Sequence, residues 1–328
     1  MHRVAAFSTF ALLALLGATS SASAQGAPAA TAATTIEEIT IIGRYPGPPL
    51  WKVSSGEHVL WIFGELSPVP KGLDWDPRNA ERVLERAEVV IGAPRVSAPT
   101  FNPIRLFRLF RAARRLARIP DGATLSQVVP PELYARYAAL RAQHLPDDEG
   151  AEEDVRPVLA ALRLYSAALD DVGLTADSGV GKTVSRLMRR SRAEEAEIVV
   201  KTEPETVLDE LGKITREAEL SCFATIMTSI ETDLDGMKER ASAWAVGNVA
   251  ELKRFDYPDS QGNCLAMLFT AGGLADLRDK LYADWLAAAQ RALADHERSF
   301  SVLPMRELIA ADGLLAQLAA RGYAVTAP

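Results

Sequence analysis

Short runs of β-branched and aromatic residues, bounded by glycine and proline, predict strands near the start of the chain. Two of these runs span residues 39–42 and 59–63. Asp76 and Pro77 then open a helix, because Asp caps a helix N-terminus and Pro fits the first turn. A further apolar run at residues 89–91 predicts a buried strand. A strand, a helix and a strand at this spacing predict a parallel βαβ unit.

The middle of the chain has a helical pattern, whereas its end returns to strands. Residues 157–293 are mostly helical, with one short strand expected at residues 197–200. A strand at 299–303, a helix at 312–320 and a terminal strand at 323–326 follow. We therefore predict an α/β fold whose central mixed or parallel sheet is formed from both ends of the chain, with a large helical insertion at about residues 101–293.

One predicted helix, at residues 104–119 after Asn102 and Pro103, is strongly basic and amphipathic. At 100° per residue, apolar side chains gather on one side of it, and five arginines share one broad face: Arg105, Arg108, Arg111, Arg115 and Arg118. Such a face suits contact with anionic lipid head groups or with an acidic polysaccharide. The alternative is a solvated face that acidic neighbours partly neutralise.

The N-terminus has the pattern of a secretory signal peptide. Residues 1–24 combine basic Arg3, a short apolar stretch and small residues before the expected cleavage point near Ala24. The apolar stretch is shorter than the ~20 residues that a spanning helix needs, so we expect no transmembrane segment after cleavage. The sequence then predicts a disordered leader at residues 25–35 and a single domain at residues 36–328, periplasmic or secreted.

Composition narrows the classes of function. The chain has 328 residues and a formal net charge of -7. A general nucleic-acid binder is normally basic, so we expect no nucleic-acid partner.

The only cysteines are Cys222 and Cys264. In an exported protein an even count favours a disulfide between them, which would tie together helices of the insertion. Two buried free thiols are the alternative.

Two segments near opposite ends of the chain carry a resemblance to a known family. The first ends in Gly64, Glu65, Leu66 and Ser67, and the second contains Pro304, Met305, Arg306 and Glu307. With the central segment that starts at Trp244, and with Arg278 ahead of the final strand, they resemble the TraB/GumN family. That family includes the metal-dependent Tiki proteases and repeats a Gly-x-x-His motif in these two segments.

This chain departs from the family at both histidines, since Ser67 and Glu307 occupy their positions. Neutral imidazole binds transition metals that activate water, and a serine hydroxyl is a poor substitute. We therefore expect no metal and no other cofactor. If the chain were a hydrolase, Glu65, Glu307 and Glu203 could form a carboxylate site, which would favour Mg, Ca or Mn. Ser67 and Glu307 should still lie near each other at the carboxyl ends of sheet strands.

Other motifs are weaker. Residues 176–183 fit a permissive phosphate-loop pattern, but no good buried strand precedes them, and we expect a helix-capping loop. His58, His144 and His296 show no ligand spacing. The leading hypothesis is an exported, catalytically degenerate binding or scaffolding protein of the cell envelope. The alternatives are a metal-dependent, peptidase-like hydrolase with a rearranged carboxylate site, and an envelope-interaction protein that uses the basic helix.

Overall fold

A computed structural model describes a large part of the chain, all of it within the compact unit formed by residues 43–328. The predicted signal peptide, the leader and the strand at residues 39–42 lie outside the described residues. The structure describes residues 47–97, 102–146, 153–177, 179–255, 264, 270 and 274–328.

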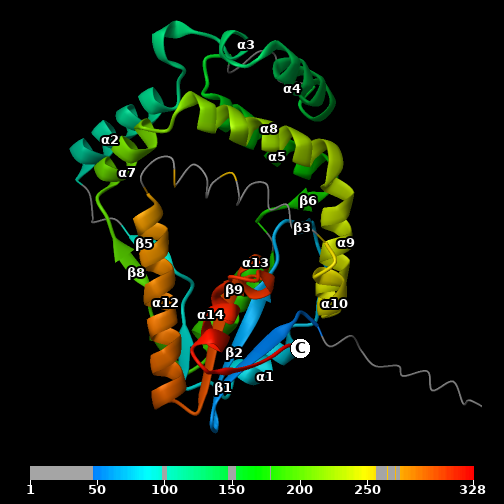
Figure 1. Cartoon of the computed structure of the whole chain (residues 1–328), viewed down its shortest axis with the longest axis vertical. Coiled ribbons are helices and arrows are strands. Elements are labelled where there is room, and N and C mark those ends of the chain that lie inside the picture. Colours follow the sequence, from blue (N-terminus) through cyan, green and yellow to red (C-terminus); the bar gives the residue numbers. More distant parts are fainter. Residues whose placement is uncertain are drawn as a thin grey trace, which may run out of the picture. The chain divides into compact units, whose positions relative to one another are not determined.

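A six-stranded sheet contains both ends of the described chain, in the order β10-β1-β2-β9-β4-β7. Strands β1, β2 and β9 of this sheet are labelled in Figure 1. Strands β2, β9, β4 and β7 are parallel to one another. At one edge β1 pairs antiparallel with β2, and β10 pairs antiparallel with β1. The predicted α/β fold with a mixed sheet formed from both ends is therefore confirmed. The strands are β1 (Leu50–Ser55), β2 (His58–Glu65), β4 (Val89–Ile91), β7 (Glu194–Ala196), β9 (Arg298–Pro304) and β10 (Ala324–Thr326).

The predicted βαβ unit is present, but its two strands are not neighbours. Helix α1 (Arg78–Leu84) connects β2 to β4, and both strands run parallel to β9, which lies between them. Strand β1 is an element that we did not predict. It alternates buried Trp51 and Val53 with less buried residues, and it joins β2 through a tight turn in which Gly56 has φ +60°. That alternation was the signal in the sequence.

Helices cover the sheet on both faces. The long helix α12 (Ala275–Asp295) lies on one face, where the indole of Trp285 donates a hydrogen bond of 3.2 Å to the hydroxyl of Ser301 on β9. The other face meets α6 (Gly179–Arg190). On that face Phe63, Trp75 and Trp244 form a cluster whose ring centroids lie 5.8–6.1 Å apart. These contacts make up the core of the sheet.

The insertion between β4 and β9 is mostly helical, as predicted, and it contains a second hydrophobic core. Of the strand expected at residues 197–200, the structure has residues 199–200, within β8, which pairs with β5. Strand β7, just before it, pairs with β4 in the central sheet and was not predicted. The remaining elements are β3 (Val69–Pro70), β5 (Arg95–Ser97), α2 (Pro103–Leu116), a 3-10 turn (Pro120–Gly122), α3 (Leu125–Val128), α4 (Pro131–His144), α5 (Pro157–Asp171), β6 (Leu174–Thr175), β8 (Val199–Lys201), α7 (Pro204–Gly212), α8 (Arg216–Thr232), α9 (Leu234–Ala245), α10 (Val249–Leu252), α13 (Met305–Ile309) and α14 (Leu314–Ala320).

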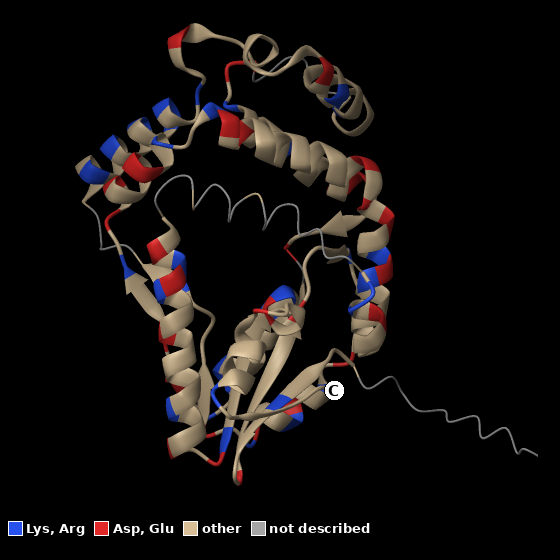
Figure 2. Cartoon of the chain, in the orientation of Figure 1, with Lys and Arg blue, Asp and Glu red and all other residues tan. Residues whose placement is uncertain are grey.

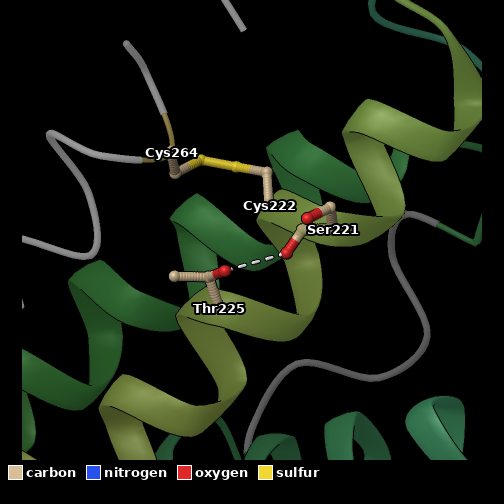
Figure 3. Close-up of a disulfide and its surroundings, with 4 residues drawn as sticks. All are labelled: Ser221, Cys222, Thr225 and Cys264. Carbon is tan, nitrogen blue, oxygen red and sulfur yellow. Dashed lines mark hydrogen bonds between the residues drawn. A yellow bond between two sulfur atoms is a disulfide. The ribbon is translucent and has the colours of Figure 1, made fainter. Parts of the chain in front are cut away.

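A disulfide joins Cys222 on α8 to Cys264, with a Cα–Cα distance of 4.9 Å (Figure 3). Both residues are fully buried in the second core. Cys222 lies within the turn of α8 in which the Thr225 hydroxyl donates a hydrogen bond to the Ser221 carbonyl. The two cysteines therefore lie at the distance of a disulfide, as the predicted pairing requires. Among the described residues no helix is long and apolar enough to cross a membrane.

Candidate functional site

The two motif segments leave the central sheet side by side. Glu65, the last residue of β2, lies opposite Pro304, the last residue of β9, in a parallel register. Ser67 and Glu307 follow within two and three residues. In open α/β sheets ligands bind beyond the carboxyl ends of such strands. The structure therefore places both motif segments at the edge of the sheet where a site is expected.

Gly64 is required by close packing. A Cβ atom at this position would clash with the Met305 sulfur and would come within 2.7 Å of the Trp51 ring. Its carbonyl accepts a hydrogen bond of 2.7 Å from the indole of Trp244, which starts the central segment of the family resemblance. The glycine of the first motif, the segment after β9 and the central tryptophan thus form one packed unit with a structural role.

Ser67 and Glu307 each have a partner of their own. The hydroxyl of Ser67 donates a hydrogen bond of 3.0 Å to the carbonyl of Ala176. The carboxylate of Glu307 accepts a hydrogen bond of 2.7 Å from Tyr282 and one of 3.2 Å from Arg306. Burial, together with the bond to Glu307, raises the pKa of Tyr282 to about 12. Both side chains therefore serve as links between neighbouring segments.

The three candidate carboxylate ligands do not come together in the structure. Glu203 precedes α7 and pairs with Arg105 on α2. Glu65 is the last residue of β2, and Glu307 accepts a hydrogen bond from Tyr282. Within the part of the chain that the structure describes, no three His, Cys, Asp or Glu side chains gather in a way that could hold a metal ion. The residues present therefore do not fit the divalent metal that the family resemblance implies.

Glu65 lines a polar cleft beside α6. The cleft has a volume of about 460 Å³, and its wall includes Lys182, Ser185, Arg186 and Arg189 of that helix. Burial raises the pKa of Glu65 above its usual value. Gly181 has no side chain, and a Cβ there would clash with the Glu65 carboxylate. The helix therefore approaches Glu65 closely, and we call this site the polar cleft.

A second cavity of about 680 Å³ continues from the polar cleft along the sheet edge. It shares Glu65, Ser185 and Arg189 with the cleft and reaches Gly92 after β4 and Glu195 on β7. Three strand ends and one basic helix thus converge at this edge. The arrangement can bind a ligand that carries carboxylate or phosphate groups, because arginine and lysine pair with such anions.

The cations of α6 are site residues that we did not predict. Lys182, Arg186 and Arg189 recur at helical spacing, which was the signal in the sequence. Lys182 belongs to the phosphate-loop-like segment, but the strand before it, β6, has two residues and pairs antiparallel with β3 outside the central sheet. Lys182 pairs with Asp177 at 2.7 Å. The context of a phosphate loop is therefore missing, although the expected helix is present.

Other candidates lie outside the cleft or have local partners. Arg278 on α12 pairs with the adjacent Asp279 at 3.1 Å. His58 bonds to the Leu293 carbonyl at 3.0 Å, and His144 bonds to Asp171 at 2.8 Å. His296 faces Glu88 at 3.6 Å. The histidine contacts join neighbouring elements, whereas the Arg278 pair lies within α12. None of these side chains lines the polar cleft.

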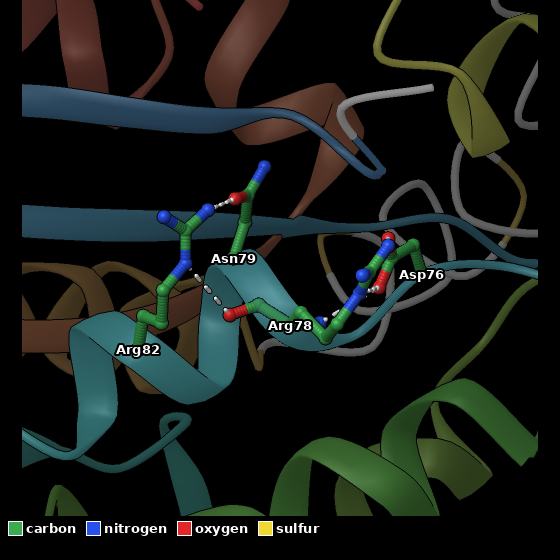
Figure 4. A network of polar contacts seen from close by, with 4 residues as sticks. All are labelled: Asp76, Arg78, Asn79 and Arg82. Carbon is green, nitrogen blue, oxygen red and sulfur yellow. Dashed lines mark hydrogen bonds and ion pairs between the residues drawn. The ribbon is translucent and has the colours of Figure 1, made fainter. Parts of the chain in front are cut away.

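A larger cavity, of about 790 Å³, lies against β1, β2 and α1 and contains none of the motif residues. Asn79 and Arg82 of α1 line it and bond to each other (Figure 4). In the same turn Arg78 is held by Asp76 through bonds of 2.8 and 2.9 Å. The polar contacts along α1 thus lie beside a third concave surface, but the converging motifs favour the polar cleft as the candidate functional site.

Comparison with known proteins gives one match. The model of the TraB/PrgY/gumN family matches residues 49–327, which include the central sheet, both motif segments and the helical insertion. No curated protein and no solved structure matches the chain.

Proposed function

Because this chain belongs to the TraB/PrgY/gumN family, we propose that it is an exported binding or scaffolding protein of the cell envelope that has lost metal-dependent hydrolysis. One observation carries this proposal. Ser67 and Glu307, at the positions where the resemblance expects histidines, are each held by separate structural hydrogen bonds. A serine hydroxyl bound to a carbonyl and a carboxylate bound to a tyrosine make a poor pair of metal ligands.

The polar cleft supports a binding role. Arg186 and Arg189 present positive charge at the end of the parallel strands, beside Lys182, which is paired with Asp177 of the same cleft. Glu65 beside them can accept a hydrogen bond from a hydroxyl or an amine of the same ligand. We therefore propose that the ligand is anionic, with carboxylate or phosphate groups, and that α6 determines this preference.

Metal content and peptidase activity test the loss of hydrolysis. We expect purified protein to hold far less than one transition metal ion per chain and to cleave no peptide with added Mn or Co. Glu203→Gln is the matched control, since Glu203 pairs with Arg105. Metal near one ion per chain that is lost in Glu65→Gln or Glu307→Gln, but kept in Glu203→Gln, would contradict the proposal.

Calorimetric titration with inorganic pyrophosphate and with a short glutamate peptide tests the binding role. Replacing both Arg186 and Arg189 by Gln should weaken binding by about a hundredfold or more, because each charged hydrogen bond contributes roughly 1.5–3 kcal/mol. Arg190→Gln is the control, since Arg190 lies on the same helix but does not line the cleft. Equal effects of the Arg186/Arg189 pair and of Arg190 would argue against the cleft.

A hydrolase that uses Glu65 for proton transfer is the second candidate. Its supporting observation is the raised pKa of this carboxyl at the carboxyl end of β2, since such shifts are common among catalytic acids and bases. This reading requires that Glu65→Gln abolish a peptidase or esterase activity of the wild-type protein. Without such an activity the binding role is favoured.

A further inference from the structure

Helix α2 exposes an apolar stripe to solvent. Within the described residues, four of the six exposed large apolar side chains belong to this helix: Ile104 at 72%, Leu106 at 58%, Phe107 at 60% and Phe110 at 56% of their surface. The helix buries none of its residues. A contiguous exposed apolar surface of this kind marks an interaction site.

Among the described residues, α2 packs along one side only, and the stripe faces away from that side. The helix packs against α7, and Arg105, Leu109 and Leu116 are its partly buried residues. Arg105 pairs with Glu203 and Glu205, and the guanidinium lowers the pKa of Glu205 to about 2. At 100° per residue these three side chains fall near one direction, and the exposed stripe of Leu106, Phe107 and Phe110 falls on another side of the helix.

The local sequence also fixes where α2 begins. Asn102 caps it by accepting a hydrogen bond of 2.7 Å from the Arg105 amide, and Pro103 takes the first position. The helix is therefore preformed and anchored at its N-terminus. A preformed helix binds without the cost of ordering its backbone.

Arginines border the stripe. Arg108, Arg111, Arg114 and Arg115 are exposed on α2, which contains no acidic residue. Figure 2 shows the Lys and Arg positions along the chain in blue. Arg105 and Arg118, in contrast, are committed to ion pairs with glutamates and with Asp154. Among the described residues, Arg111, Arg114 and Arg115 form no ion pair. The helix thus concentrates positive charge on a chain whose net charge is -7.

Two of these arginines lie directly over the aromatic rings of the stripe. The guanidinium carbon of Arg111 is 6.0 Å from the Phe107 ring centroid, and that of Arg114 is 5.7 Å from the Phe110 centroid. This arrangement keeps charge and apolar surface side by side. A partner must therefore have anionic groups and an apolar phase that lie next to each other, separated by no more than the length of one side chain.

We propose that α2 docks on the surface of an anionic phospholipid bilayer. Leu106, Phe107 and Phe110 enter the boundary between head groups and acyl chains, and the arginines bind lipid phosphates. An acidic polysaccharide would satisfy the charge but would leave the apolar side chains in water. With 14 residues α2 is too short to span a bilayer, so it lies in the plane of the interface. This docking does not depend on the ligand of the polar cleft.

Sedimentation with phosphatidylcholine vesicles, with and without phosphatidylglycerol, tests the proposal. The full chain should bind only the anionic vesicles, and added salt should weaken this binding. The variant Phe107→Ser/Phe110→Ser should bind at least about tenfold more weakly, because two large apolar side chains no longer enter the bilayer. Leu159→Ser is the matched control, since Leu159 is an exposed leucine of α5 and should be irrelevant to vesicle binding.

A charge variant separates the two contributions. Arg111→Gln/Arg114→Gln should also lose anionic-vesicle binding, whereas Arg190→Gln on α6 should keep it. The positions on α2 are exposed, so circular dichroism melting should give the same Tm for all variants. Equal binding to neutral vesicles, or binding that the phenylalanine variant retains, would overturn the proposal. If the protein binds alginate, and this binding needs the arginines but not the phenylalanines, the surface would instead bind a polysaccharide. If the protein self-associates, and the phenylalanine variant does not, the surface would instead bind a second copy of the chain.

Discussion

Reduction of the disulfide between Cys222 and Cys264 should strongly destabilise the helical insertion. The bond closes a loop with a sequence separation of 42 residues. In the chain-entropy relation, a loop of this length stabilises the folded state by about 4 kcal/mol at 25 °C. Both cysteines are fully buried in the second core, so the bond joins segments that also share apolar contacts.

Urea unfolding with and without a reductant measures this effect. With an unfolding slope near 3 kcal/mol per molar urea, the loss corresponds to a midpoint lower by about 1.3 M. Circular dichroism reports the helices, whereas fluorescence reports the sheet core, because all five tryptophans lie in or against that core. We expect reduction to lower the urea midpoint measured by circular dichroism at least as much as the midpoint measured by fluorescence.

The variant Cys222→Ala/Cys264→Ala is the control, and the reductant should not change its transition. Alkylation followed by mass spectrometry shows whether the bond is present before reduction and absent after it. An unchanged midpoint in wild-type protein whose two cysteines are shown to be reduced would refute the loop-entropy reasoning. Two alkylated cysteines in native exported protein would refute the disulfide itself.

Two further predictions concern buried charge. Since burial raises the pKa of Glu65 above 4.5 in the folded state, its protonated form stabilises folding below pH 4.5, and that contribution is lost as the pH rises through the raised pKa. Glu65→Gln should therefore gain stability over wild type as the pH rises from 4.5 to neutrality in urea titrations, and a gain of the same size at every pH would contradict this. Buried Arg240 binds Asp233 through two bonds of 2.8 and 2.7 Å, so Arg240→Met should lower the free energy of unfolding by about 3–5 kcal/mol. Arg240→Met/Asp233→Leu should recover much of this loss in the same assay, and a double variant as unstable as the single one would show that the unpaired aspartate is not the cause.

Local features of the sequence determined where most elements lie. The apolar runs of β2, β4 and β9 predict strands because β-branched and aromatic side chains fit a half-buried pleated surface. Asn102 and Pro103 predict the start of α2 because a side-chain cap and a fixed φ act within one turn. The departures from the family motif, Ser67 and Glu307, are likewise visible without any structure.

Tertiary structure decided which segments meet. Strand β9 lies between β2 and β4, although over two hundred residues separate it from both, and pairing at that distance leaves no local pattern. The same holds for the polar cleft, where α6 brings Arg186 and Arg189 to Glu65. Periodicity made α2 amphipathic, but only its packing against α7 determined that Phe107 and Phe110 face solvent. Propensities and caps act over one turn, whereas burial is a property of the neighbours that the whole chain assembles.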